Sequence, residues 1–580
     1  MILQALARYY DDLLQQGKIS APGWTKVKIS YALDIGLDGQ LKQVIPTRQD
    51  ETVGKKTVQR PQEMVLPAPI KKTSGASSNF LWENSGYLLG IKQKEEPQRS
   101  LKCFETAREL HHALLDGVDS PNAKAILRFF DSWQPEEAAQ HPMLSGELDE
   151  ITAGGNLVFR IEGTYPQEDS WIREAWDKAR NSSSKDAVKM QCLITGQEDE
   201  IVAVHPSIKG VRDAQSSGAA LVSFNAPAFC SYGHEQNYNA PVGKHAAFAY
   251  TAALNHLLSD RNSVQHIGDT TVVCWAEGAE EAYQNLAQFA LFGQEMPGLT
   301  DNDLRAALKR LANGLPCDDL GVDPKRPFYV LGLAPNAARL SVRFFLHDSF
   351  GKLMKNVNDH YDRMEIVRPS FDKQEILPLW LMLRETVNLN SRDKAPSPAM
   401  AGATVRAVFS GGPYPASLLE AVMLRIRAES SVTRGRAAII KAYYLKNPHS
   451  DCPKEVLTVS LNEAGNNPAY ILGRLFSVYE AVQQSANPGI NTTIKDKYFN
   501  SAAAMPASIF PVLNNLYQKH LRKLAPGLRI SYDKQVMELK GALGENYPVR
   551  MTLAQQGAFD LGYYHQTQRR YTKKEDQNNG

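Results

Sequence analysis

The sequence predicts an α+β protein in which β-rich, mixed N-terminal domains precede an all-α C-terminal helical bundle. Three observations support this prediction. Residues 25–35 alternate between apolar and polar side chains, as a half-buried strand does. Continuous apolar runs at 270–275 and 328–333 indicate buried strands. Beyond residue 396, apolar side chains recur at helical spacing along most of the chain.

We expect three parts in the 580 residues, a number of domains that the chain length allows. They are a basic, β-rich unit at 1–100, a mixed α/β body at 101–395 and a basic helical bundle at 396–580. The proline-containing segment KAPSP, at 394–398, marks the last boundary. No apolar run is long enough to span a membrane and the N-terminus is not a secretory signal, so we expect a cytoplasmic protein without a membrane partner.

The N-terminal unit opens with an amphipathic helix at 2–16. One face of the strand at 25–35 is predicted to hold Val27, Ile29, Tyr31, Leu33 and Ile35. Asp38-Gly39 is a hairpin turn signal, and 40–45 supply the return strand.

A polar linker at 70–79 joins two short apolar runs, and 85–91 are expected to close the unit as a hairpin. The linker contains two cations, small hydroxyl and amide groups and a glycine: Lys71, Lys72, Thr73, Ser74, Gly75, Ser77, Ser78 and Asn79. Cations neutralise phosphates, and small polar groups reach base edges in a groove. The loop is therefore a candidate contact with nucleic acid, and a solvated surface loop is the alternative.

The middle of the chain mixes helices and strands. Helical patterns cover much of 100–148 and also 170–180 and 245–259, and strands are expected at 156–161 and 219–225. The last of these strands leads into a loop at 226–244 that is crowded with Asn, Gly, Tyr and Phe.

A further alternating strand at 339–346 is expected to pair with the run at 328–333. Its inward face is predicted to hold Leu340, Val342, Phe344 and Leu346, and its other face Arg339, Ser341 and Arg343. Two arginines on one face of a sheet can carry an RNA or DNA backbone, and a solvated outer face is the alternative.

The helices of the predicted bundle carry clear start signals. Asn467 and Pro468 suit the N-cap and first position of a helix that ends near 484. Thr552 and Gln555 form a capping box for a last helix, and we expect disorder in 572–580. A helix at 508–524 has three cations near its C-terminal end, where the helix dipole also favours them: Lys519, Arg522 and Lys523.

Charge is unevenly divided along the chain. Residues 396–580 hold 22 Lys and Arg against 13 Asp and Glu, whereas 1–395 hold 43 against 50. Within the acidic part, residues 18–102 hold 14 basic and 8 acidic side chains. Two basic regions around an acidic body fit a polyanion that is gripped at two places, and ordinary variation between domains is the alternative.

Motifs for catalysis are few. The sequence has no phosphate-binding P-loop, no nucleophile elbow and no H-E-x-x-H helix, and its six cysteines and thirteen histidines lack metal-ligand spacing. We therefore expect no catalytic residue, no metal and no cofactor. The alternative is a cysteine-dependent hydrolase that uses Cys230 with His234 or His245, although a cysteine after an apolar run is usually a core residue.

Several segments together resemble the large subunit of the type I-C CRISPR surveillance complex, Cascade. They are LVSFNAPAFCSYGHEQNYNAP at 221–241, FAYTAALNHLL at 248–258, GDTTVVCWAE at 268–277, FYVLGLAPNAARLSVRF at 328–344, NPAYILGRLFSVYEAVQ at 467–483 and LGYYHQTQ at 561–568. The KKTSG loop and the following YLLG also match that family, so the resemblance runs from end to end.

The resemblance implies a non-catalytic role in antiviral defence. The family's proteins sit in a ribonucleoprotein with CRISPR RNA, repeated backbone subunits and a subunit at the RNA 5′ end. They are implied to recognise the protospacer-adjacent motif in double-stranded DNA, to help start the R-loop, to hold the displaced strand and to recruit the helicase–nuclease. The C-terminal portion resembles the small subunit, which is implied to be made separately from the same gene.

The resemblance suggests contacts to the motif-bearing duplex from Lys71, Lys72, Thr73, Ser74, Gly75 and Asn79. Exposed amides and aromatics also suit base contact, so a weaker second loop comprises Asn225, Tyr232, Gln236, Asn237 and Asn239, with burial against a sheet as its alternative. Contacts with the displaced strand or RNA are expected from Arg339, Arg343, Lys519, Arg522 and Lys523. A purely structural adaptor remains a third reading of the chain.

Overall fold

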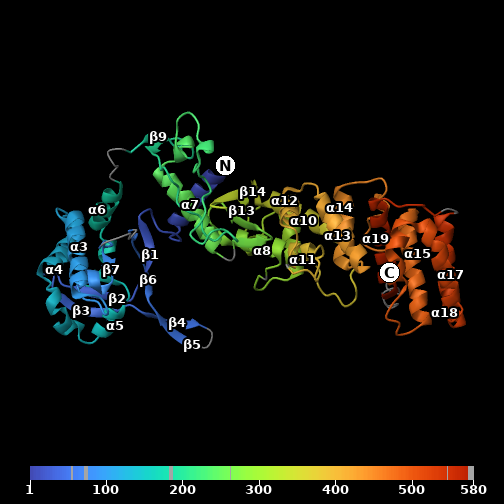
Figure 1. Cartoon of the computed structure of the whole chain (residues 1–580), viewed down its shortest axis with the longest axis horizontal. Coiled ribbons are helices and arrows are strands. Elements are labelled where there is room, and N and C mark those ends of the chain that lie inside the picture. The colour runs from blue at the N-terminus through green and yellow to red at the C-terminus, as the bar shows by residue number, and fades with distance from the viewer. Residues whose placement is uncertain are drawn as a thin grey trace. The chain divides into compact units, whose positions relative to one another are not determined.

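The computed structural model describes residues 1–53, 56–70, 76–181, 187–260, 263–294, 296–392, 394–544 and 547–571. The chain forms two compact units, whose elements are labelled in Figure 1. We call 3–205 with 224–250 the N-terminal unit, and 1–2, 206–223 and 251–580 the C-terminal unit. The predicted α+β class is confirmed, because strands concentrate in the first two thirds of the chain and helices follow. Both sides of the KAPSP segment belong to the C-terminal unit, and the division expected at 1–100, 101–395 and 396–580 stays a prediction.

The N-terminal unit is built on a four-stranded sheet of order β3-β2-β8-β7. Its strands are β2 (Tyr31–Ile35), β3 (Leu41–Pro46), β7 (Trp82–Glu83) and β8 (Leu157–Ile161). β2 and β8 are parallel, and the other pairs are antiparallel. Phe104, Phe129 and Phe159 belong to one buried core between this sheet and its helices, which are α3 (Pro97–Leu115), α4 (Pro121–Ser132), α5 (Leu148–Ala153) and α6 (Ser170–Asn181). Removal of these rings from water stabilises the unit.

The single strand predicted at 25–35 is two strands, because the chain bends at Ser30 and changes sheet. β1 (Trp24–Ile29) pairs with β6 (Gln62–Pro67) in a separate antiparallel ribbon. At the bend, the Ser30 N–H donates to the Asn156 carbonyl at 2.9 Å, and the Ser30 carbonyl accepts from the Thr47 N–H at 3.0 Å. These two bonds give the Ser30 N–H and carbonyl their hydrogen-bond partners at the point where the chain passes from one sheet to the other. All five side chains of the predicted apolar face are buried, as expected.

The hairpin predicted at Asp38-Gly39 is confirmed, since β2 and β3 pair across it and Gly39 adopts a φ of 82°. The hairpin predicted at 85–91 is wrong. Asn84 accepts a hydrogen bond from the Gly86 N–H at 3.0 Å and starts the short helix α2 (Ser85–Leu88), a capping role that asparagine often takes. The other elements of this unit are α1 (Ile2–Gln15), β4 (Gln49–Val53), β5 (Lys56–Arg60), β9 (Lys189–Gln191) and β10 (Glu198–Glu200).

The strand predicted at 219–225 is also wrong. Only isolated bridges join Ala219 to Ile208 and Ala220 to Arg339. Ala219 is the single buried residue in 219–225. The segment therefore lacks the row of buried side chains that would stabilise a strand. Helix α7 (Lys244–Ser259), predicted at 245–259, contributes residues to both units.

The C-terminal unit begins with an antiparallel sheet in which four strands follow one another in order. They are β11 (Val264–Ile267), β12 (Thr270–Ala276), β13 (Pro327–Asn336) and β14 (Arg339–Ser349). Every residue of β12 is buried, as the continuous apolar run predicted. Side chains of the sheet share one core with α8 (Glu281–Phe292), α9 (Asp301–Ala312) and α10 (Phe350–Met364).

The alternation predicted for 339–346 fails at a β-bulge. Leu333 pairs with Val342, but its neighbour Gly332 pairs with Phe344, so Arg343 is an extra residue in β14. An extra residue reverses which side chains face the core. Leu340 and Phe344 are buried as predicted, whereas Val342, also predicted to point inward, is 41% exposed.

Helices occupy the rest of the chain, as expected, and the described helices include none long and apolar enough to cross a membrane. Their bounds are α11 (Leu379–Arg384), α12 (Pro398–Ser410), α13 (Ala416–Glu429), α14 (Arg434–Lys446), α15 (Pro468–Ala486), α16 (Ile494–Ala504), α17 (Pro506–Leu521), α18 (Pro526–Leu543) and α19 (Leu553–Tyr571). The predicted caps are confirmed: Asn467 accepts from the Tyr470 N–H at 3.1 Å, and Thr552 and Gln555 bond reciprocally.

Helices α15 (orange in Figure 1) and α19 (dark red) pack backbone to backbone in the bundle. A Cβ atom on Gly473 would collide with the carbonyl oxygen of Phe559, and one on Gly562 would collide with that of Tyr470. Glycine is therefore required at both positions, because no other residue lets two helices approach so closely.

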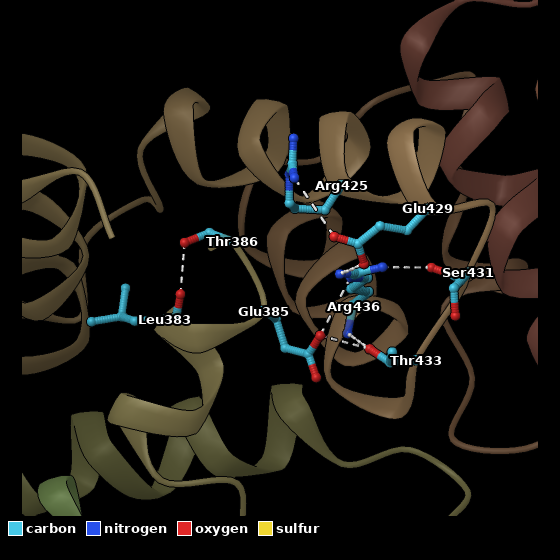
Figure 2. A network of polar contacts seen from close by, with 8 residues as sticks. All are labelled: Leu383, Glu385, Thr386, Arg425, Glu429, Ser431, Thr433 and Arg436. Atoms are coloured by element: carbon cyan, nitrogen blue, oxygen red, sulfur yellow. Dashed lines mark hydrogen bonds and ion pairs between the residues drawn. The ribbon is translucent and has the colours of Figure 1, made fainter. Parts of the chain in front are cut away.

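A buried ionic network joins the segment after α11 to α13 and α14 (Figure 2). The Arg436 guanidinium forms ion pairs with Glu385, at 3.3 Å, and with Glu429, and it donates to the Ser431 carbonyl at 2.9 Å. Its side chain is 6% exposed. Thr433 caps α14 and donates to Glu385 at 2.8 Å. A buried guanidinium with this many partners fixes how the three segments pack.

Candidate nucleic-acid interface

Five residues of the first candidate loop, Lys71 to Gly75, lie outside the described residues, but the base of the loop is well defined. Asn79 Oδ1 accepts from the Ile70 N–H at 3.1 Å, and Asn79 Nδ2 donates to Glu83 Oε1 at 2.7 Å. The indole N–H of Trp82 donates to the Pro67 carbonyl at 2.8 Å. These bonds hold together the two chain segments that enter and leave the loop.

Asn79 was predicted to reach base edges, and its side chain instead faces inward. It is 3% exposed, and both ends of its amide bond to the protein. The sequence shows that Asn79 is polar and lies in a polar loop. It does not show that the Asn79 amide group donates to Glu83 and is therefore not available to a base. The structure gives Asn79 the role of a clamp between the loop and β7.

A buried histidine fixes the backbone that follows the clamp. Leu81 has a φ of 67°, a left-handed conformation that is strained for a leucine. Its N–H donates to His111 Nε2 at 3.0 Å, and His111 Nδ1 lies 2.7 Å from the Ala107 carbonyl. Burial lowers the pKa of His111 to about 4, so the ring is neutral at pH 7 and can accept at one nitrogen while it donates at the other.

The ribbon that leads into the loop presents two lysines that we did not single out from the sequence. Lys26 and Lys28 of β1 are exposed on one face, opposite Val65 and Glu63 of β6. The alternation of β1 already placed them together, but only the pairing with β6 shows that they lie beside the strand that runs into Lys71 and Lys72. Lys28 lies opposite the carboxylate of Glu63, so Lys26 is the lysine that adds net positive charge to this face.

Loss of the clamp should loosen the loop base. In Asn79→Ala, we expect faster hydrogen exchange at the Ile70 amide and a free energy of unfolding lower by about 2 kcal/mol, because buried Glu83 loses a donor. Ser78→Ala, which among the described residues removes a bond to the Asn79 carbonyl, is the matched control. Unchanged Ile70 protection combined with an altered preference for DNA sequence would contradict the clamp role.

The second candidate loop, at 225–239, is exposed over most of its length, so the alternative of a wholly buried loop is wrong. Tyr232 is 99% exposed and has a φ of 53°, followed by Gly233 with a φ of 75°. Asn225 and Gln236 are also exposed, whereas Asn237 is buried. An aromatic ring held outward is suited to stacking on a base.

Asn239 organises this loop from inside. Its amide donates to the His234 and Gln236 carbonyls at 3.1 and 2.9 Å, and its oxygen accepts from the Ser231 N–H at 2.8 Å. All three polar contacts of its side chain are therefore to loop backbone. Asn239, predicted to contact bases, serves to hold the turn that displays Tyr232.

The possible hydrolase residues are held by separate contacts. Cys230 Sγ approaches the Ala226 carbonyl at 3.7 Å, and the His245 ring packs edge-on against Tyr10. His234 is exposed in the turn. Within the described part of the chain, no group of three or more His, Cys, Asp or Glu residues could hold a metal ion.

The predicted strand and bundle cations lie in the C-terminal unit. Arg343 pairs with Asp269 at 2.9 Å and its side chain is 48% exposed. Arg339 lies at the start of β14. Lys519, Arg522 and Lys523 are exposed at the C-terminal end of α17, where Lys523 Nζ donates to Asn487 at 3.2 Å. This cluster is accessible, and its place at a helix end also suits the helix dipole.

The family model described as CRISPR-associated protein (Cas_Csd1) matches residues 6–571. The chain belongs to the Csd1 family of CRISPR-associated proteins. The match covers nearly the whole chain and supports a Csd1-type large subunit of a Cascade complex, so the resemblance found in the sequence motifs is confirmed. No curated protein matches the chain. Membership in the Csd1 family is consistent with association with CRISPR RNA and with other subunits.

Proposed function

We propose that this Csd1-family chain is the non-catalytic large subunit of a type I-C complex that recognises the protospacer-adjacent motif in duplex DNA. The observation that carries the proposal is the clamped loop base: Asn79 bonds to Ile70 and closes the segment whose sequence includes Lys71 and Lys72, and Lys26 and Lys28 of β1 are exposed. A rigid base reduces the entropy lost when a loop binds. Lys71 and Lys72 supply phosphate contacts, and Thr73, Ser74 and Gly75 allow close approach to base edges.

Opened DNA is held elsewhere on the chain in this proposal. Tyr232 stacks on an unpaired base, and Arg339, Arg343, Lys519, Arg522 and Lys523 contact phosphates of the displaced strand or of RNA. Target sequence is read by base pairing with CRISPR RNA, whereas the protein reads only the flanking motif. The partners are then the repeated backbone subunits, the subunit at the RNA 5′ end, small subunits from the same gene and the helicase–nuclease that cuts.

Removal of the loop charges should weaken DNA binding without preventing assembly. For a complex containing Lys71→Ala/Lys72→Ala, we expect affinity for motif-bearing duplex to fall at least tenfold, and the slope of log affinity against log salt to fall by about two. Electrophoretic mobility shifts over a salt series measure both quantities. Lys102→Ala/Lys178→Ala, which removes two exposed lysines from α3 and α6, is the matched control.

Equal losses of affinity for duplex DNA in the two double variants would indicate diffuse electrostatic attraction. That result would refute the assignment of the loop as the DNA contact. Intact binding in both would support a structural adaptor. An activity that needs no RNA and disappears in Cys230→Ala would instead favour the hydrolase alternative.

A further inference from the structure

A cavity of about 510 Å³ lies in the C-terminal unit beside the sheet and along the whole length of α12. Two arginines line it, Arg343 from β14 and Arg406 from α12, together with the hydroxyl-bearing residues Thr270 and Ser410. Among the described residues, no Asp or Glu lines the cavity. Its size is that of a site for a nucleotide-sized ligand.

The β-bulge places Arg343 at this cavity. As the extra residue of β14, it is outside the regular pairing with β13, and a bulge redirects the side chain that it carries. Its ion pair with Asp269 joins side chains that are 48% and 31% exposed, so the pair holds Arg343 weakly. Arg406 is exposed and has no hydrogen bond or ion pair with any described residue.

Two further features favour an anion with an apolar part. The first turn of α12 has no acidic residue and the Ser397 side chain makes no capping bond, so the positive end of the helix dipole is not neutralised there. The rest of the cavity wall is mostly apolar and includes Ala399, Ala403, Ala407 and Pro413. Guanidinium groups bind phosphate, and an apolar wall packs against a sugar or base.

We propose that this cavity binds one nucleotide of a single-stranded nucleic acid, with Arg343 and Arg406 on its phosphate and the apolar wall at Ala403 and Pro413 against its sugar or base. The inference rests on the proposed function and adds a binding pocket to it, with Arg406 as a contact that sequence reasoning missed. A duplex would present its phosphates on the outside of a stiff rod, whereas a single strand can turn one nucleotide into a cavity of this size.

The test measures binding of the full chain to a fluorescein-labelled single-stranded DNA, and to RNA of the same sequence, by fluorescence anisotropy over a salt series. We expect Arg343→Ala and Arg406→Ala each to weaken binding about three- to tenfold, and the double variant to lower the salt slope by about two. Ala403→Phe, which narrows the cavity without changing charge, should weaken binding by a similar factor. Arg550→Ala, an exposed arginine outside the cavity, is the matched control.

The proposal is overturned if Ala403→Phe binds like the wild type, or if Arg550→Ala loses as much affinity as either cavity variant. Competition by inorganic phosphate that fully displaces the oligonucleotide at low concentration would also overturn it, since the site would then be a simple anion site. Arg343→Lys/Arg406→Lys tests the same contacts should the alanine variants misfold, and it should still bind more weakly because lysine lacks the guanidinium fork. If the cavity variants bind like the wild type but Lys71→Ala/Lys72→Ala still weakens duplex binding, only the proposed nucleotide pocket is refuted. If neither set of variants weakens binding, the proposed function is refuted as well.

Discussion

Replacement of Gly473 by alanine should destabilise the C-terminal unit by about 2–3 kcal/mol, although alanine favours helix. A Cβ atom at this position would overlap the Phe559 carbonyl, so α15 and α19 must separate to admit it. Because the two helices share the buried core of the bundle, their separation exposes apolar side chains along both. Urea denaturation followed by helical circular dichroism measures the change.

Gly541→Ala is a matched control for which we expect a change in the free energy of unfolding of the opposite sign. Gly541 is also a helical glycine of the bundle, but an added Cβ would meet no atom within 4 Å. Gly541→Ala should therefore raise the free energy of unfolding by about 0.5–1 kcal/mol, through lower entropy of the unfolded chain and better helix propensity. Equal effects of the two substitutions would show that α15 and α19 do not meet at Gly473.

Arg436→Met should lower the free energy of unfolding at pH 7 by about 2–3 kcal/mol, because it leaves the largely buried Glu385 without its cation. The loss at Glu429 is smaller, since that side chain is 37% exposed and keeps Arg425 at 3.6 Å. Arg569→Met is the control, since Arg569 and Glu463 pair with side chains 48% and 63% exposed, and it should change stability by less than about 1 kcal/mol. Chemical denaturation of the full chain compares the two. A loss of the same size in both variants would contradict the buried role of Arg436.

The Arg436→Met effect should depend on pH. Burial already raises the pKa of Glu385 above its ordinary value of 4.5, and loss of the cation raises it further. The folded variant then binds more protons than the unfolded chain between the ordinary and the folded pKa, so its stability rises as pH falls through that window. The difference from the wild type should therefore shrink as pH falls from 7 towards 4.5.

Local signals in the sequence were sufficient for much of the fold. The caps at Asn467 and Thr552, the turn at Gly39 and the buried strand β12 each depend on a few neighbouring residues, and each was predicted correctly. The errors occurred where a distant partner decides the outcome. Nothing near Ser30 shows that Asn156 will receive its N–H, and nothing near Arg343 shows the bulge against Gly332.

The same limit applied to the candidate site. Residue type and loop composition identified a polar loop, but Asn79 and Asn239 hold backbone instead of facing outward. Lys26 and Lys28 gain their significance from strand pairing, and Arg406 gains its significance from a cavity shared with Arg343. Sequence reasoning could find the polar side chains, but it could not separate those that support the site from those that face a ligand.

The hydrogen bond between Asn79 and Ile70 has a consequence for engineering. Because Asn79 ties the chain to Ile70, and Ala76 and Ser78 pack on or lie within the N-terminal unit, the segment between Ile70 and Ala76 is a cassette whose flanks the scaffold already fixes. Libraries that randomise this cassette, with Ile70, Asn79 and Glu83 kept, should retain the fold while they vary the loop tip. Selection from such libraries offers a route to variants with altered DNA preference on an unchanged scaffold.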